Sequence, residues 1–266
     1  MKRYETPNFN YHHLTTDNPF SLSILDHIHP QYEFLYFLNG EADYVINSSV
    51  YNLKKRDFLL IHPGTFHHLI PKSNMQYERI CIHFYPSAIP KAFKNSIKNF
   101  KSVYHIHKYS AIDNIFSTLL NSEYEKHYSE ADITYLVAQY FGIILTHLKY
   151  LQEETELLPY ETNDLINNVL TFIDDNIEAP LNVHILSKKF FRSPSTLAHY
   201  FSSSMHFSLQ QYITSKKIIH AQTLIQQGTP PTAVATQLSF KDYSSFFKCY
   251  KRVLGHTPSH DQPEHK

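Results

Sequence analysis

Four polar side chains near the start of the sequence have types and spacing that could do chemistry. His27, His29, Glu33 and Gly40 fit the pattern HxH-x3-E-x6-G, and His67 closes a later run, Pro-Gly-Thr-Phe-His. Three imidazoles and one carboxylate suit a divalent transition metal, and an open metal site can support catalysis. The same side chains could instead line a pocket for a polar ligand or bond to one another inside a barrel.

We interpret this group as part of an effector pocket. Further histidines nearby, His62, His68 and His83, are interpreted as chance neighbours, because the chain contains 19 histidines. We expect no cofactor and no catalytic residue, with a metal held by His27, His29, Glu33 and His67 as the alternative. The predicted pocket residues are His27, His29, Glu33, Tyr36, His67 and Arg79.

The elements that must position these residues differ along the chain. Residues 20–84 contain short apolar runs separated by turn signals, which predicts strands of a sandwich or barrel. Residues 109–150 change to a helical period, and their apolar stripe could pack on the barrel, on a second subunit or on both. We predict dimerisation through Ile133, Val137, Tyr140, Ile144 and Leu148. Residues 151–162 are acidic, contain Pro159, and are predicted to be a linker.

Charge divides the chain more sharply than its zero net charge suggests. Residues 180–260 hold nine lysines and arginines and a single acid, Asp242. Such a basic block indicates a nucleic-acid-binding module. Only five glycines occur, and no GxGxxG or GxxxxGK[ST] pattern is found, which removes the motif evidence for a nucleotide-binding enzyme. We identify no signal peptide and no apolar run long enough to span a membrane, so we expect a cytoplasmic protein with reduced cysteines.

The basic block contains two segments that each predict a helix, a short turn and a second helix. In the first, residues 183–190 precede a turn at Phe191-Arg192, and Ser193-Pro194 begins the next helix with a capping hydroxyl and a first-turn proline. Small or polar residues face outward on that helix, as expected of a helix in the major groove. The candidate DNA contacts are Lys188, Arg192, Ser195, Thr196, Ala198, His199 and Ser202.

The second segment repeats this arrangement. Residues 231–238 form its first helix, and Asp242 caps a helix that continues to Val253. The candidate contacts are Lys241, Tyr243, Ser244, Ser245, Lys248, Lys251 and Arg252. A helix over residues 208–227 joins the segments, and its length of about 30 Å is close to one turn of B-DNA, about 34 Å. We expect the first segment to supply more base selectivity and the second more phosphate anchoring.

Two resemblances follow from these motifs. Ser193-Pro194-Ser195-Thr196-Leu197 with Tyr212-Ile213, and later Asp242-Tyr243 with Gly255-His256-Thr257-Pro258, resemble the AraC/XylS-type DNA-binding domain over residues 163–262. The resemblance implies seven helices, two reading helices and promoter binding. The family usually has glycine where this chain has Phe191, His206 and Ser239. The histidine and glutamate pattern resembles the cupin motifs, although Arg56-Asp57 stands where a glycine is expected.

Together these features predict an α+β protein with two domains. Residues 1–150 would form a cupin-like β-barrel with appended helices that binds effector and dimerises, and residues 163–262 an all-helical domain with two helix-turn-helix units. The predicted function is a transcription regulator controlled by a small molecule, by family analogy a sugar. Its expected partners are promoter DNA, a second copy of the chain and, for an activator, RNA polymerase, with no membrane. The alternatives are a metal-dependent cupin enzyme with a DNA-binding tail and a regulator without an effector.

Overall fold

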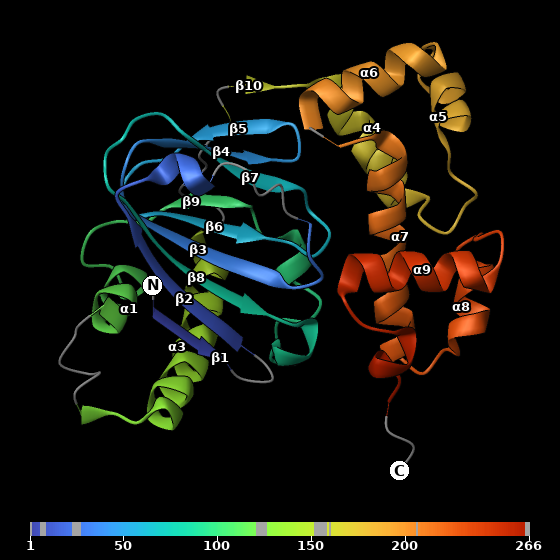
Figure 1. The fold of residues 1–266 in the computed structure, drawn as a ribbon. Coiled ribbons are helices and arrows are strands. Elements are labelled where there is room, and N and C mark those ends of the chain that lie inside the picture. Colours follow the sequence, from blue (N-terminus) through green and yellow to red (C-terminus); the bar gives the residue numbers. More distant parts are fainter. Residues whose placement is uncertain are drawn as a thin grey trace. The chain divides into compact units, whose positions relative to one another are not determined.

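The structure is a computed structural model that describes residues 2–5, 9–22, 28–120, 127–151, 159, 161–205 and 207–263. The chain divides into two compact units, one made mainly of residues 1–161 and the other mainly of residues 162–266. The first unit is rich in strands, and the second is built of helices (Figure 1). This confirms the predicted α+β fold class. The predicted linker, residues 151–162, lies mostly outside the described residues.

The described strands of the first unit form two sheets and do not close into a single barrel. The larger sheet has the order β1-β2-β8-β3-β6-β9 and the smaller β10-β5-β4-β7, with antiparallel neighbours such as β3–β8 and β4–β7. The strands are β1 (Lys2–Glu5), β2 (Phe9–Thr16), β3 (Tyr32–Asn39), β4 (Ala42–Ile46), β5 (Ser49–Asn52), β6 (Asp57–Ile61), β7 (His67–Pro71), β8 (Tyr77–Phe84), β9 (Val103–His105) and β10 (Glu161–Thr162).

Residues of β3 are buried on both faces of the larger sheet. Phe34 and Tyr36 belong to one core, which also contains residues of α1 (Ala111–Leu120) and α3 (Glu130–Leu151). Leu35 and Phe37 belong to a second core, shared with β4 and β7 of the smaller sheet. Because side chains alternate along a strand, Glu33 lies on the same face as Leu35 and Phe37. The polar residues of this second face therefore lie among apolar side chains. The described residues of this unit also form three 3-10 helices: η1 (Pro19–Leu22), η2 (Pro86–Ala88) and η3 (Ile97–Asn99).

The apolar stripe of α3 packs on the larger sheet of its own unit (Figure 1). Val137, Ile144 and Leu148 are 3%, 0% and 0% exposed, and Ile133 and Tyr140 are partly buried against the same core. The sheet covers Val137, Ile144 and Leu148, so the predicted dimer interface is wrong for these three residues. For Ile133 and Tyr140 it stays a prediction. Of the two packing surfaces that the stripe could have used, the structure shows the sheet.

The second unit contains six described α-helices and the 3-10 helix η4 (Pro258–Asp261). The helices are α4 (Asp164–Asp175), α5 (Val183–Lys189), α6 (Pro194–Met205), α7 (Leu209–Gln226), α8 (Pro231–Gln237) and α9 (Tyr243–Leu254). Their boundaries follow local chemistry. Asn163 caps α4, Ser208 and Gln211 form a capping box at the start of α7, and Gly255 ends α9 in the left-handed conformation. In the described part of the chain, no helix is long and apolar enough to cross a membrane.

Two turns of this unit adopt the backbone conformation that favours glycine without having one. Phe191 follows α5 with φ 52°, and Ser239 follows α8 with φ 58°. These are two of the three positions at which the resemblance leads one to expect glycine, and the third, His206, lies outside the described residues. The turns therefore keep the expected shape at a cost in backbone strain. Phe191 also places a 91% exposed ring at the surface.

Candidate DNA-binding and ligand-binding sites

Helix α6 is the second helix of the first helix-turn-helix unit, and its start is fixed as the sequence predicts. The Ser193 hydroxyl accepts a hydrogen bond from the Thr196 amide at 3.1 Å, and Pro194 occupies the first turn. Leu197, Phe201 and Met205 are 0% exposed and anchor the helix to the unit. The opposite face of α6 is therefore held rigidly toward solvent.

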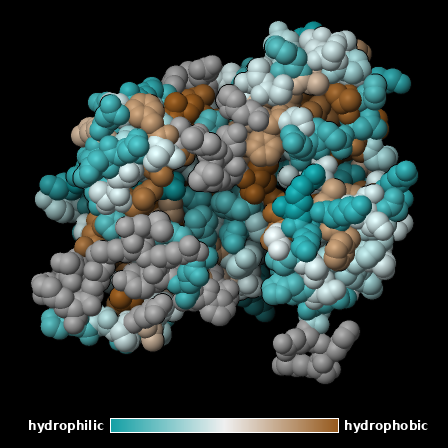
Figure 2. Space-filling view, viewed as in Figure 1, coloured by the Kyte–Doolittle hydropathy of each residue, from teal (hydrophilic) through white to brown (hydrophobic). Residues whose placement is uncertain are grey.

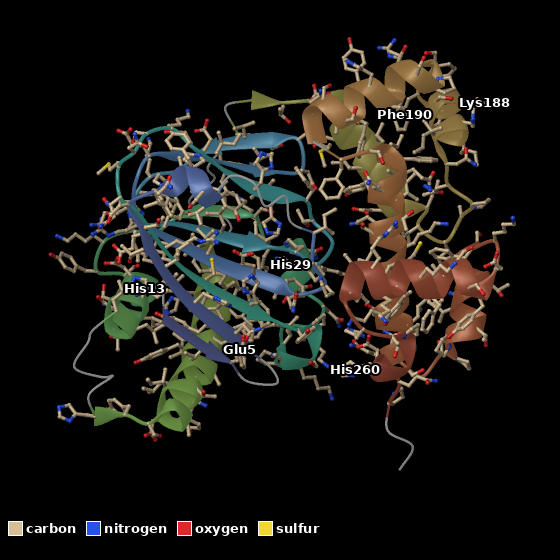
Figure 3. The ribbon with its side chains drawn as sticks, in the orientation of Figure 1. Glu5, His13, His29, Lys188, Phe190 and His260 are labelled. Atoms are coloured by element: carbon tan, nitrogen blue, oxygen red, sulfur yellow. The ribbon has the colours of Figure 1, made fainter. Side chains whose placement is uncertain are left out.

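Most of the predicted contacts of this unit are exposed: Lys188, Arg192, Ser195, Thr196, His199 and Ser202 are exposed, and Ala198 is half-buried. Lys188 lies on α5 (Figure 3). Ser195 and Thr196 also serve the cap, because their hydroxyls lie 3.0 and 2.7 Å from the Ser193 hydroxyl. His199 thus presents an exposed imidazole on α6, beside the half-exposed ring of Tyr200.

Helix α9 has the same design with more positive charge. The Asp242 carboxylate accepts a hydrogen bond from the Ser245 amide at 2.7 Å. This bond, assisted by Lys241 and Lys248, holds the pKa of Asp242 below its usual value, so the cap is charged at neutral pH. The buried side of α9 is formed by Phe246 and Tyr250. Exposed residues are Lys241, Tyr243, Ser244, Lys248, Lys251 and Arg252, and Ser245 is half-buried.

Helix α7 connects the two helix-turn-helix units, with α5–α6 toward one end and α8–α9 toward the other (Figure 1). Its 18 residues span about 27 Å, somewhat less than one turn of B-DNA. The two reading helices could therefore enter successive stretches of major groove. Hydrophilic residues and residues of intermediate hydropathy cover much of the visible surface of this helical unit (Figure 2).

Lys217 of α7 is a buried lysine that the sequence analysis missed. It is 6% exposed, and its ammonium donates hydrogen bonds of 2.7 Å to the carbonyls of both Ala179 and Leu238. Burial lowers its pKa. The signal was present, because Lys217 lies four residues from Ile213 and from Ala221 on the buried face of α7.

Glu178 adds contacts at the same place. Its carboxylate accepts hydrogen bonds from His220 of α7 at 3.2 Å and Gln237 of α8 at 3.1 Å, and its carbonyl accepts one from Ser239. We call Glu178, Ala179, Lys217 and Leu238 the interhelix clasp. It connects the segment after α4 to both α7 and the end of α8, so it fixes the two helix-turn-helix units relative to each other.

In the strand-rich unit, Glu33 is the centre of a buried polar group. It is 2% exposed, and its two oxygens contact the Cys81 thiol at 3.1 Å, His83 at 3.2 Å and His67 at 3.3 Å. The Cys81 pKa is raised well above its usual value, first by burial, so this cysteine is a thiol that donates to Glu33. The predicted pair Glu33 and His67 is brought together, while His83 and Cys81 are additions.

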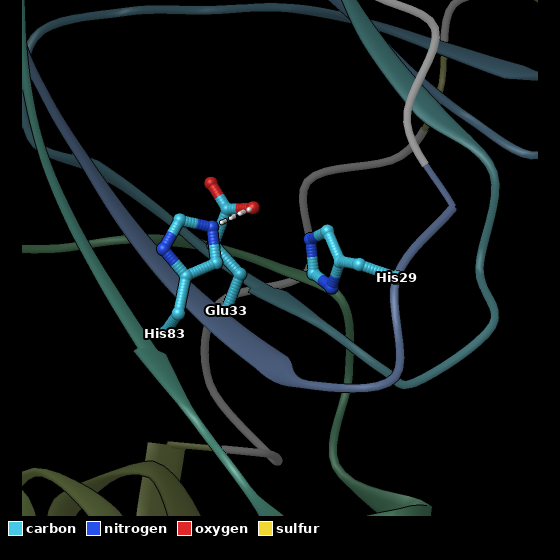
Figure 4. Close-up of side chains that lie close together, drawn as sticks. All are labelled: His29, Glu33 and His83. Atoms are coloured by element: carbon cyan, nitrogen blue, oxygen red, sulfur yellow. Dashed lines mark hydrogen bonds and ion pairs between the residues drawn. The ribbon is translucent and has the colours of Figure 1, made fainter. Parts of the chain in front are cut away.

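The predicted metal set lies only partly within the described residues. His27 lies outside the described residues, but His29, Glu33 and His83 place ligand atoms within 4.8 Å of one another (Figure 4). Two imidazoles and one carboxylate could hold a divalent cation. The Glu33 carboxylate also has protein partners on both oxygens, so the group is a coherent hydrogen-bonded cluster in its own right.

The structure separates Tyr36 from the other predicted pocket residues. Tyr36 lies on the opposite face of β3 and donates a 2.7 Å hydrogen bond to Asp113 of α1, which is paired with Arg56. The pKa of Asp113 is lowered, because these bonds outweigh the effect of burial. Tyr36 therefore links the sheet to α1 and does not line the face that carries Glu33. Arg79 does lie on that face, two residues from Cys81 along β8.

Comparison with known proteins gives consistent assignments for both units. A family model described as an AraC-like ligand binding domain matches residues 23–136, and a model described as a helix-turn-helix domain matches residues 186–262. The regulatory protein SoxS of Escherichia coli is 26% identical over 96 residues, covering 36% of this chain and 90% of SoxS. The transcriptional activator RhaR of Salmonella heidelberg is 26% identical over 121 residues, covering 45% of this chain and 43% of RhaR.

Solved structures are similar at lower levels of identity. ToxT from Vibrio cholerae is 13% identical with a TM-score of 0.40, over 95% of this chain and 97% of ToxT. The DNA-binding domain of AdpA, solved in complex with a target DNA, is 20% identical with a TM-score of 0.34, over 37% of this chain and 89% of that domain.

Proposed function

This chain belongs to the AraC-type DNA-binding transcription regulators, and we propose that it controls promoters in response to a small polar effector, a sugar or a related metabolite. One observation carries the proposal. Helices α6 and α9 are capped, lie near opposite ends of α7, and present exposed polar faces to solvent within a stretch of high positive charge. The strand-rich unit supplies a buried polar group suited to binding a small molecule.

The two reading helices would divide the work. On α6, exposed His199 lies among small polar residues and beside Tyr200, which favours contact with base edges. On α9, three exposed cations favour contact with phosphates, which position a protein but carry no base sequence. An effector would act by changing how strongly the two helix-turn-helix units bind paired sites on DNA. In an activator, RNA polymerase would be a further partner.

Removing the His199 imidazole should change sequence preference more than overall affinity. We expect His199→Ala to lose about 1–3 kcal/mol of discrimination at one or two base pairs of a selected site. Lys248→Ala is the matched control, because it should weaken binding to all sequences by a similar factor. The measurement is binding of the full chain to a library of randomised duplexes, followed by sequencing.

Equal loss of affinity at every position in both variants would contradict the assignment of α6 as the more selective helix. Unchanged affinity in both would show that neither helix faces DNA. Salt dependence in the wild-type protein is a further requirement, since phosphate contacts release counterions.

Dimerisation is proposed through the outer face of α3 in place of its buried stripe. Tyr135, Ile143 and Tyr150 are 65%, 43% and 72% exposed, and they recur at spacings of eight and seven residues along one side of the helix. We expect Tyr135→Glu combined with Ile143→Glu to raise the dimer dissociation constant at least 10-fold, by placing charge in an apolar contact. Sedimentation equilibrium checks this, with the exposed Lys98→Glu as control. A wild-type protein that is monomeric throughout would refute the proposal.

A further inference from the structure

Arg79 is a half-buried cation in the strand-rich unit whose role the proposed function leaves open. On β8, alternate residues Tyr77, Arg79, Cys81 and His83 face the second core. In the sheet register, Arg79 stands between Leu14 of β2 and Phe37 of β3. Both immediate cross-strand neighbours of the guanidinium-bearing residue are therefore apolar.

Among the described residues, no carboxylate forms an ion pair with Arg79. The Glu33 carboxylate is engaged by Cys81, His67 and His83, at a register position four residues along the strand from Arg79. Glu78, the adjacent acid, bonds to His13 on the other face of the strand. The Arg79 Nε is buried without a hydrogen-bond partner. A guanidinium is always charged, and a buried donor atom without a hydrogen-bonded partner is costly to keep.

Two phenols accompany this guanidinium. Arg79 interacts electrostatically with Cys81, with the phenols of Tyr77 and Tyr44, and with the Glu33 carboxylate. The Tyr77 hydroxyl is also buried without a hydrogen-bond partner. Burial raises the pKa of Tyr77, so its hydroxyl keeps its proton and can donate it. A guanidinium whose Nε has no acceptor, beside a phenolic donor, is the complement of a carboxylate.

We infer that the effector carries a carboxylate, which Arg79 binds with help from the hydroxyls of Tyr77 and Tyr44. The inference rests on the proposed function and narrows its effector from sugars and related metabolites to small organic carboxylates. The planar guanidinium would hold both oxygens in a bidentate pair, as a neutral sugar hydroxyl cannot be held. Arg79 is thus a residue that determines effector class.

The test compares matched acids and neutral compounds on the full chain. We would measure the thermal unfolding midpoint with glucuronate, galacturonate, gluconate, lactate and butyrate, and with glucose, galactose, glycerol and butanol. At least one acid should raise the midpoint by mass action, and its neutral counterpart should not. Arg79→Met should abolish the shift and Arg79→Lys should reduce it, whereas the exposed Lys54→Met should keep it.

The unliganded protein gives a second readout. If Arg79 is reserved for a ligand, Arg79→Met removes no hydrogen bond of the unliganded protein, and its unfolding midpoint should stay close to that of the wild type. A clear fall would show that Arg79 has a structural partner and would overturn the inference. A panel in which no acid shifts the midpoint would overturn it as well.

Neutral ligands separate this inference from the proposed function. A shift with neutral sugars alone would overturn the carboxylate class and leave effector control intact. DNA affinity that stays constant while a bound acid raises the midpoint would support the site and contradict effector control. Both results use the same purified protein.

Discussion

We expect affinity for promoter DNA to fall about 100-fold near 0.15 M salt when Lys248, Lys251 and Arg252 are all replaced by alanine. Each phosphate contact contributes about 0.9 to the slope of log affinity against log salt, or about fivefold at this salt concentration. The three side chains are exposed on α9, and Asp242 at its start is held as a helix cap. The slope should therefore fall by about 2.7 if all three meet phosphates. Fluorescence anisotropy across a salt series measures both quantities.

A control of equal charge distinguishes contact from general attraction. Lys91, Lys94 and Lys98 are exposed in the strand-rich unit, and their replacement by alanine removes the same three charges. That variant should keep the slope of the wild type and lose at most a few-fold in affinity. If both triple variants lose affinity equally and keep the same slope of log affinity against log salt, α9 does not contact the phosphates.

The first helix-turn-helix unit, α5–α6, provides the comparison within the DNA-binding surface. It offers Lys188 and Arg192 as exposed cations, so their double replacement should cost about 30-fold and about 1.8 in slope on the same arithmetic. The larger loss at α9 would express the division of roles between the two helices. A reversed order would assign anchoring to the first unit.

The helical unit could be predicted closely because its signals are local. Asn163, Ser208 and Asp242 cap their helices through bonds to amides three residues away, so the sequence contains both partners of each bond. The conformation at Phe191 and Ser239 also followed from position, since the turn requires a left-handed residue whichever side chain occupies it.

The strand-rich unit was predicted less completely because its contacts depend on sheet register. His83 reaches Glu33 only because β8 lies beside β3 with those two residues opposite each other. Tyr36 lies away from Glu33 for the same reason, since alternate residues of β3 face different cores. The stripe of α3 gave the correct helix face, but periodicity alone cannot say whether a sheet or a second subunit covers it.

Lys217→Met is expected to lower the free energy of unfolding of the helical unit by about 3 kcal/mol. Methionine fills a similar volume, but it leaves the carbonyls of Ala179 and Leu238 without the ammonium that each accepts at 2.7 Å. A buried acceptor left unsatisfied costs about 1–3 kcal/mol. Urea unfolding of the full chain, combined with hydrogen exchange of peptides from α7 and α8, gives the change and its location.

Lys216→Met is the matched control because it changes the neighbouring lysine of the same helix. Lys216 pairs with Asp174 at 2.7 Å, and the aspartate side chain is 48% exposed. A pair that is partly open to solvent contributes about 0–1 kcal/mol, so this variant should lose much less stability. Equal losses in the two variants would mean that the effect comes from removing charge on α7 and not from the interhelix clasp.

The interhelix clasp also has a consequence for DNA that stability alone does not. Lys217 joins the segment after α4 to the end of α8, so its loss frees the two helix-turn-helix units to change their relative angle. Binding that needs both helix-turn-helix units at once then loses the entropy of re-aligning them. We expect Lys217→Met to weaken binding to a duplex with both contact sites about 10-fold, and to leave binding to either half alone within a factor of two. Equal weakening on half and full sites would show that the variant damages a reading helix, whereas an unchanged ratio in a stably folded Lys217→Met protein would show that α7 alone sets the spacing.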